Sequence, residues 1–199
     1  MRIKSHWFKE GKPKSAAEIA DAAAFIVWRI AQNSLKTMRA ARFDLPPGPR
    51  YFAFMAEFLA FLALGADRFA HRRGDEAWRV AFTTTLANRV GGILAENESD
   101  LLGAESADDV KGRFVAIVNE CAKESEPFEW NAEGPDYAFL CFLGHRVADI
   151  MTDQDRTWAI SQVIEVEAPD AAANLHRGMA GLLDQTPRRR ERGARATGE

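Results

Sequence analysis

Apolar side chains recur with the 3.6-residue period of an α-helix along most of the 199-residue chain. The first run begins at a capping box, because Ser15 stands three residues before Glu18 and the apolar positions follow at once. A Pro-Pro-Gly-Pro turn at 46–49 then ends this helix and starts a second one, since proline suits the first helical turn. The remaining runs predict helices over 75–97, 106–121, 136–151, 153–164 and 169–183, with a loop over 98–105.

The second predicted helix, from Pro49 to about Arg73, is apolar around almost its whole circumference. Between 51 and 69, only Glu57, Asp67 and Arg68 interrupt the apolar positions. A helix that is hydrophobic on every side is buried on every side. We therefore predict an all-α fold, a single-domain helical bundle of about six or seven helices with a largely apolar central second helix.

Two further expectations concern the C-terminal third of the chain. The sixth helix takes Asp153 as its cap, and its apolar face is expected to contain Trp158, Ile160, Val163 and Ile164. Pro169 is expected to break that helix and to start the seventh, because proline lacks an N–H group and its ring clashes inside a helix. Residues 164–167 alternate between apolar and polar positions, but this run is too short to build a sheet.

Charge divides the chain into three parts. The net charge of −3 comprises +4 over residues 1–14 and +3 over residues 186–199, which leaves −10 for residues 15–185. We expect a basic N-terminal arm over 1–14, the helical bundle domain over 15–185 and a disordered, Arg-rich tail over 186–199. A solvated tail is favoured over contact with nucleic acid or an anionic membrane through Arg188–Arg195.

The cysteines and the hydrophobic stretches indicate in which cellular compartment the protein is expected. Cys121 and Cys141 lie far apart in apolar surroundings, which is typical of small core residues in a reducing compartment. The most hydrophobic stretch, from Tyr51 to Leu64, covers about 21 Å as a helix, well short of a ~30 Å hydrocarbon core. We therefore expect a cytoplasmic protein without a transmembrane segment or a secretory signal.

The chain lacks the short motifs that identify common catalytic and metal sites: a Gly-rich phosphate loop, H-E-x-x-H, G-x-S-x-G and zinc-type Cys/His spacing. Asp67 and His71 are four residues apart, as are His145 and Asp149, but a di-iron bundle needs a different spacing and two more glutamates. We interpret both pairs as surface or capping contacts. No catalytic residue, metal site or cofactor is therefore assigned.

A few polar side chains are still candidates for contact with a ligand. Glu57 is predicted to be buried and paired with an arginine of a neighbouring helix, Arg29 or Arg89, because buried carboxylates are usually paired. The alternative interpretation makes Glu57 a buried acid or a ligand-binding group. The residues selected as candidate ligand contacts are Glu57, Arg68, His71, Thr84, Arg89 and His145.

Three functions follow from this pattern. The first is a non-enzymatic interaction or accessory protein that binds another protein and forms a homodimer through the first or second helix, because exposed apolar helix surface marks a partner site. The second is a domain that binds a small molecule in a pocket between helices around Glu57. The third is an enzyme that uses Glu57 as its acid or base. The absence of catalytic motifs favours the first.

Overall fold

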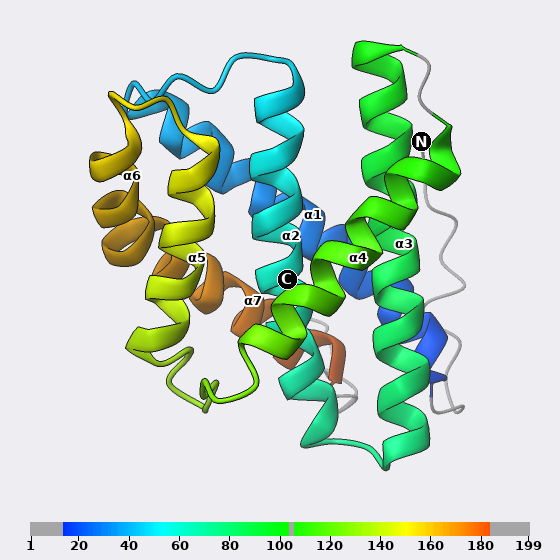
Figure 1. The fold of residues 1–199 in the computed structure, drawn as a ribbon. Helices are drawn as coiled ribbons and strands as arrows, with labels where there is room; N and C mark the ends of the chain where they lie inside the picture. Colours follow the sequence, from blue (N-terminus) through cyan, green and yellow to red (C-terminus); the bar gives the residue numbers. More distant parts are fainter. Residues whose placement is uncertain (1–13, 104–105, 184–199) are drawn as a thin grey trace, which may run out of the picture.

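The computed structural model describes residues 14–103 and 106–183 of the chain (Figure 1). These residues form seven α-helices and one π-helical segment: α1 (Ala16–Ala40), α2 (Pro49–His71), α3 (Glu76–Leu102), α4 (Ala107–Glu124), α5 (Tyr137–Ile150), α6 (Arg156–Gln162), η2 (Val163–Glu167) and α7 (Ala168–Leu183). The β-type pairing within the described ranges is a single isolated bridge between Trp130 and Pro135. The all-α fold predicted from the sequence is confirmed. The predicted arm and tail lie outside the described residues, except for Lys14 at the end of the arm.

Helix α2 occupies the centre of the bundle. It packs against α1, α3, α4, α5 and α7, and Figure 1 shows α4 crossing one side of α2 and α3 while α1 passes on the other. Phe54, Phe58, Leu59 and Leu62 of α2 are completely buried. The prediction of a largely apolar central second helix is therefore confirmed. Its apolar circumference is covered within one chain, so α2 no longer provides an argument for a dimer.

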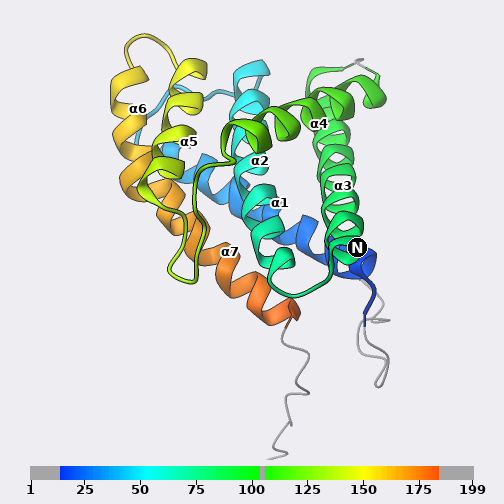
Figure 2. The same cartoon turned by 60° about the horizontal axis from the view of Figure 1, so that its bottom comes forward.

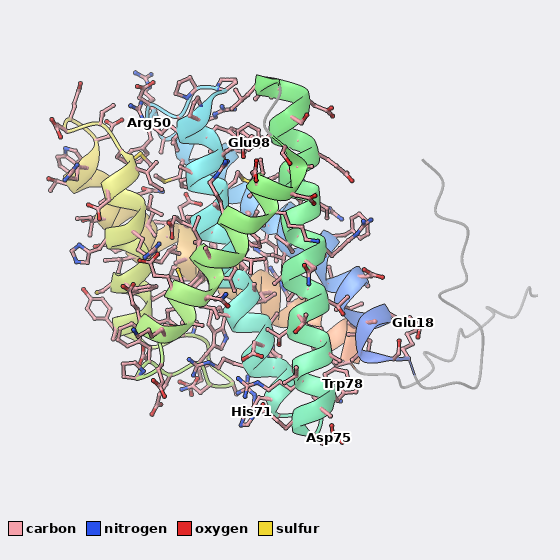
Figure 3. The ribbon with its side chains drawn as sticks, turned by 45° about the vertical axis from the view of Figure 1, so that its right-hand side comes forward. Glu18, Arg50, His71, Asp75, Trp78 and Glu98 are labelled. Carbon is pink, nitrogen blue, oxygen red and sulfur yellow. The ribbon has the colours of Figure 1, made fainter. Side chains whose placement is uncertain are left out.

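The helix starts follow from local chemistry. Ser15 and Glu18 form the predicted capping box, in which Glu18 N donates to Ser15 Oγ at 3.2 Å and Ser15 N donates to Glu18 Oε2 at 2.9 Å. Asp75 and Asp136 cap α3 and α5 in the same way, each accepting a backbone N–H three residues later at 2.8 Å. Figure 3 shows Glu18 and Asp75 at the ends of their helices.

The predicted loop over 98–105 is wrong in its first part, because α3 continues to Leu102. Glu98 accepts a hydrogen bond from Arg113 of α4 at 2.9 Å, and α4 packs along α3. The polar side chains of Asn97, Ser99 and Asp100 are exposed. Polarity here marks the solvated side of a helix rather than a loop.

The expected break at Pro169 is also wrong. Helices α6, η2 and α7 follow one another without interruption, and Figure 2 shows them as one continuous rod. Within the π-helical turn, Ala168 N donates to the carbonyl of Val163, five residues earlier. The wider turn accommodates the proline ring, which would clash with the preceding turn of a regular α-helix. The sixth helix begins at Arg156 rather than at Asp153.

Candidate functional site

Glu57 is paired with an arginine, as expected, but the partner is Arg146 of α5 rather than Arg29 or Arg89. The guanidinium donates from Nε to Glu57 Oε2 at 2.5 Å and from Nη2 to Oε1 at 3.0 Å. Both side chains are largely buried, at 12% exposure for Glu57 and 20% for Arg146. The two residues are 89 positions apart, so the pairing depends on how the helices pack and not on any local pattern.

Arg146 also forms ion pairs with two carboxylates of α4. Its guanidinium lies 3.4 Å from Glu120 Oε2 and 3.3 Å from Glu124 Oε2. The hydrogen bonds to Glu57 raise the pKa of Arg146 above its usual value, so this side chain is a permanent cation. The cluster joins α2, α4 and α5, and the Glu57 carboxylate is engaged at both oxygens.

Cys121 lies beside this cluster, with its Sγ 4.0 Å from Glu57 Oε2. Burial, reinforced by the charge of Glu57, raises the pKa of the Cys121 thiol to about 12. Because the thiolate is the nucleophile, a thiol of this kind is inert at neutral pH. The region around Glu57 therefore supplies a structural ion cluster and no activated nucleophile.

Arg68 organises the connector between α4 and α5. It donates to the carbonyl oxygens of Phe128 at 3.0 Å and of Ser125 at 3.2 Å. His71 is exposed at the end of α2, and Figure 3 shows it close to Asp75 in the turn that leads to α3. The contacts of Glu57 are with Arg146 and Cys121, so Arg68 and His71 do not form one site with it.

The other predicted contacts are dispersed as well. Thr84 and Arg89 are exposed on α3, and His145 is exposed on α5. The Arg89 guanidinium lies 5.5 Å from the ring centroid of Phe25 in α1, a cation–π contact between the two helices. The structure does not bring the six predicted residues together into one site.

The two histidine–carboxylate pairs differ in burial. Asp67 is 7% exposed, so its interpretation as a surface or capping contact is wrong, whereas His145 and Asp149 are exposed. The Asp67 carboxylate is engaged by Arg79, at 2.7 and 3.0 Å, and by the Thr83 hydroxyl, which donates to it. The Asp149 carboxylate forms a long ion pair with Arg156, with 3.9 Å between Oδ1 and Nη1. The side chains of residues 14–103 and 106–183 contain no group of three or more potential ligands that could hold a metal ion.

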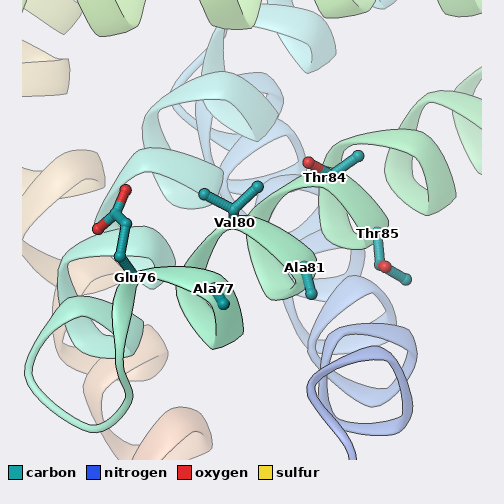
Figure 4. A pocket seen from close by; sticks show the side chains of 6 residues that line it. All are labelled: Glu76, Ala77, Val80, Ala81, Thr84 and Thr85. Carbon is teal, nitrogen blue, oxygen red and sulfur yellow. The ribbon is translucent and has the colours of Figure 1, made fainter.

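Thr84 lines one surface hollow, which is formed by α3 alone. Figure 4 shows its lining side chains: Glu76, Ala77, Val80, Ala81, Thr84 and Thr85. Because a single helix supplies all of them, no second wall encloses a ligand. We interpret this hollow as an exposed helix face.

A second hollow is enclosed from two sides, and we name it the α6 groove. The segment that follows α1 forms one wall, and α6 with η2 forms the other. The groove has a volume of about 460 Å³ and is lined by Ala41, Arg42, Phe43, Asp155, Trp158, Ser161, Gln162, Glu165 and Val166. The prediction that Trp158 belongs to the apolar core face of the sixth helix is wrong. Trp158 is 73% exposed, and Ala159 and Val163 take the buried positions.

An unusual backbone conformation forms the first wall of the α6 groove. Among the described residues, Arg42 is the one residue other than glycine with a positive φ, of 71°. Arg42 N donates to Arg39 O and Phe43 N donates to Met38 O, the hydrogen-bond pattern of a Schellman motif. Glycine is the usual residue at this left-handed position, because a Cβ atom costs about 1–2 kcal/mol there.

The wall formed by Arg42 and Phe43 is fixed to the opposite wall. Asp44 N donates to Asp155 Oδ2 at 2.9 Å, so the segment after α1 is tied to the start of α6. Backbone conformations that carry strain are concentrated at functional sites, where the surrounding structure holds them. The α6 groove therefore combines a left-handed residue with a hydrogen bond between its two walls.

The second wall contains η2, the one π-helical segment of the described chain. Gln162 Nε2 donates to Glu167 Oε1 at 3.0 Å across this turn, and Glu167 is 3% exposed. Burial raises the pKa of the Glu167 carboxyl group. Single π-helical turns inside α-helices occur frequently at functional sites.

The α6 groove is the feature that sequence reasoning missed. A π-helical turn and a left-handed arginine leave no pattern in a single sequence. The one sequence signal for an exposed Trp158 is that its neighbours Thr157 and Ser161 are polar, and both are exposed in the structure. The apolarity of Trp158 itself favours the core face.

No family model, no curated protein and no solved structure matches this chain. The functional argument therefore depends on the geometry of the chain itself. Among the helices of the described residues, none combines the length and the apolarity needed to cross a bilayer.

Proposed function

We propose that this protein is a non-enzymatic interaction protein that binds another protein through the α6 groove. The observation that carries the proposal is the exposure of Trp158 in a hollow whose two walls are joined by a hydrogen bond. An indole ring is costly to leave in water, and tryptophan, tyrosine and arginine are the residue types enriched among interface hot spots. Trp158 and Arg42 both line the groove.

A second large aromatic residue of the described chain, Tyr137, is strongly exposed. It lies at the start of α5 and is 71% exposed. Tyr137 is not among the residues that line the α6 groove, so Trp158 is the exposed ring that the groove itself presents. A large amphipathic ring in an open hollow fits a protein interface better than a small closed pocket.

The other functions considered from the sequence have less support. Glu57 lines neither the α3 hollow nor the α6 groove, and its carboxylate is held by Arg146. The predicted homodimer is still a proposal. Its interface would lie outside α2, because the apolar surface of α2 is covered within one chain. Both cysteines are free, which is compatible with the proposed cytoplasmic location.

The test is site-specific photo-crosslinking in the native host. A photoreactive amino acid placed at position 158 should capture a discrete partner, whereas the same amino acid at the exposed position Thr84 of α3 should not. With the partner then purified, Trp158→Ala should weaken binding by about 30-fold, the effect of losing a hot-spot side chain of about 2 kcal/mol. Equal capture at both positions, or unchanged affinity of Trp158→Ala, would refute the proposal.

A further inference from the structure

We infer that the partner segment received by the α6 groove is basic and amphipathic: it presents an apolar side chain together with a lysine or arginine about one helical turn away. This inference rests on the proposed function and adds the chemistry of the partner. It is carried by the charges of the groove and of the bundle, by the exposed Trp158 ring and by the apolar part of the hollow.

The charged side chains that line the groove are Arg42, Asp155 and Glu165, one cation and two carboxylates. One oxygen of Asp155 is already engaged, since it accepts the N–H of Asp44. Glu165 is exposed and takes part in no ion pair among the described residues. Its carboxylate is therefore the acceptor that a cation of the partner would meet.

Further acidic residues stand near Asp155 in the sequence or pair with residues next to it. Asp149 and Asp153 are both exposed, and they share one cation, Arg156, at the long distances of 3.9 and 3.8 Å. Asp44, which donates its N–H to Asp155, is paired with Arg50 at 3.1 Å. One arginine thus serves two carboxylates in the segment that leads into α6.

The net charge of the bundle acts in the same direction over a longer range. Residues 15–185 carry a net charge of −10, obtained from the chain total of −3 after removal of +4 and +3 for the two basic ends. A field of one sign steers a partner of opposite charge and disfavours one of like charge. An acidic partner segment would approach against this field.

Aromatic rings beside a carboxylate favour a cation further. Glu165 lies on the same wall as the exposed Trp158 ring. The face of an indole ring attracts a cation, so this wall offers a lysine or arginine both a carboxylate and an aromatic ring. The side chains of Phe43 and Val166 leave an apolar part of the same hollow for a neighbouring apolar side chain.

The experiment uses the full chain and a random peptide library displayed on phage. Peptides are selected on the wild-type protein and depleted on the Trp158→Ala variant, so that only peptides that need the α6 groove remain. We expect these peptides to share an apolar residue followed or preceded by lysine or arginine within about four positions, the spacing of one helical turn. Peptides that depend on Trp158 but are neutral or acidic would overturn the inference and leave the proposed function intact. The absence of any Trp158-dependent peptide would count against both.

A selected peptide then permits a measurement of the contribution of Glu165. Glu165→Gln should weaken binding about three- to fivefold, the range of an exposed ion pair, with the loss abolished at high salt. The matched control is Glu76→Gln, since Glu76 is an exposed glutamate on the α3 face outside the groove. An equal loss in both variants would mean that the attraction is non-specific, and no loss in Glu165→Gln would mean that the groove carboxylate argued to receive the cation binds none. Either result would overturn the inference.

Discussion

Gly65 of α2 and Trp130 of the α4–α5 connector are in direct contact, and the contact leaves no space for a side chain at position 65. A Cβ atom there would lie 2.5 Å from Cη2 of the Trp130 ring. The same ring packs against Phe61 and Phe139, at centroid distances of 5.0 and 5.7 Å. The connector is therefore held against α2 through a ring that only glycine admits at this distance.

Gly65→Ala is expected to destabilise the fold. Overpacking of a buried ring costs about 1–3 kcal/mol, and the better helix propensity of alanine recovers about 1 kcal/mol, so the net loss should reach about 2 kcal/mol. The measurement is the free energy of unfolding in urea. The matched control is Gly92→Ala in α3, where a Cβ atom meets nothing within 4 Å. This control should be stabilised, and a loss of stability in both variants would contradict the steric explanation.

Removal of the two members of the Glu57–Arg146 pair should have unequal costs. In Glu57→Ala, the arginine keeps Glu120 and Glu124, so we expect a loss of about 2–3 kcal/mol, below the usual cost of breaking a buried pair. In Arg146→Ala, the buried Glu57 loses its cation and faces two other carboxylates, so the loss should be larger. Chemical denaturation of both variants and of the double variant measures the difference. Equal costs would show that the α4 carboxylates do not compensate Arg146.

Glu167→Gln should raise stability at neutral pH. Burial raises the pKa of Glu167 above its unfolded value near 4.5, so the folded state holds this proton more tightly than the unfolded state does. The stabilising effect of protonation is fully present below pH 4.5 and is lost as the pH rises through the raised pKa. Glutamine removes the charge and can still accept the hydrogen bond from Gln162.

The advantage of Glu167→Gln over the wild type should therefore shrink as the pH falls and disappear below the unfolded pKa. Denaturation at several pH values measures this trend. As a control, Glu165→Gln replaces an exposed glutamate of the same segment and should change stability by no more than about 0.5 kcal/mol. A Glu167→Gln variant less stable than the wild type at neutral pH would mean that the buried carboxylate makes a favourable interaction that glutamine cannot replace.

Arg42→Gly should stabilise the protein by up to about 1 kcal/mol, because glycine adopts the left-handed conformation without the Cβ penalty. Arg42→Ala keeps that penalty and should bring no gain, which makes it the matched control. Thermal unfolding of the two variants distinguishes conformational relief from the loss of the arginine side chain. If both variants were equally stabilised, the left-handed backbone would not be the cause.

Trp158→Ala and Trp130→Ala should differ strongly. Trp158 is largely exposed, so its removal should change stability by no more than about 0.5 kcal/mol. Trp130 is buried among aromatic rings, and its removal should cost about 3–5 kcal/mol. Denaturation curves measure both. A Trp158→Ala variant as unstable as Trp130→Ala would show that the indole supports the fold, and its effect on binding could not then be assigned to the α6 groove.

The sequence predicted those parts of the fold that depend on local chemistry. The capping box at Ser15 and the central position of α2 follow from a few adjacent residues and from one apolar run. The pairing of Glu57 with Arg146 could not be predicted, because both Arg29 and Arg89 satisfied the same local argument. Only the packing of α5 against α2 distinguishes among the three arginines.

The errors at Trp158 and Pro169 have different causes. Trp158 stands in the regular helix before η2, and its apolarity groups it with Val163, although the two are five residues apart and the buried residue four positions before Val163 is Ala159. A break at Pro169 is expected from the sequence because a regular α-helical turn excludes a proline ring, and the π-helical turn removes that break.

The extra residue of η2 changes the direction in which the side chains of α7 point relative to those of α6. Restoring a regular α-helix by deleting one residue would rotate α7 relative to α6 by about 100°. Helix α6 packs on α5, whereas α7 packs on α1 and α2. A regular α-helix over the same residues would keep one apolar face, which could not point to α5 in its first half and to α1 and α2 in its second half. After such a deletion, either Ala159 of α6 or Leu175 of α7, both fully buried in the structure, would no longer face the core. A change of a single residue in chain length at this turn would thus separate the wall of the groove from the packing that holds it in place.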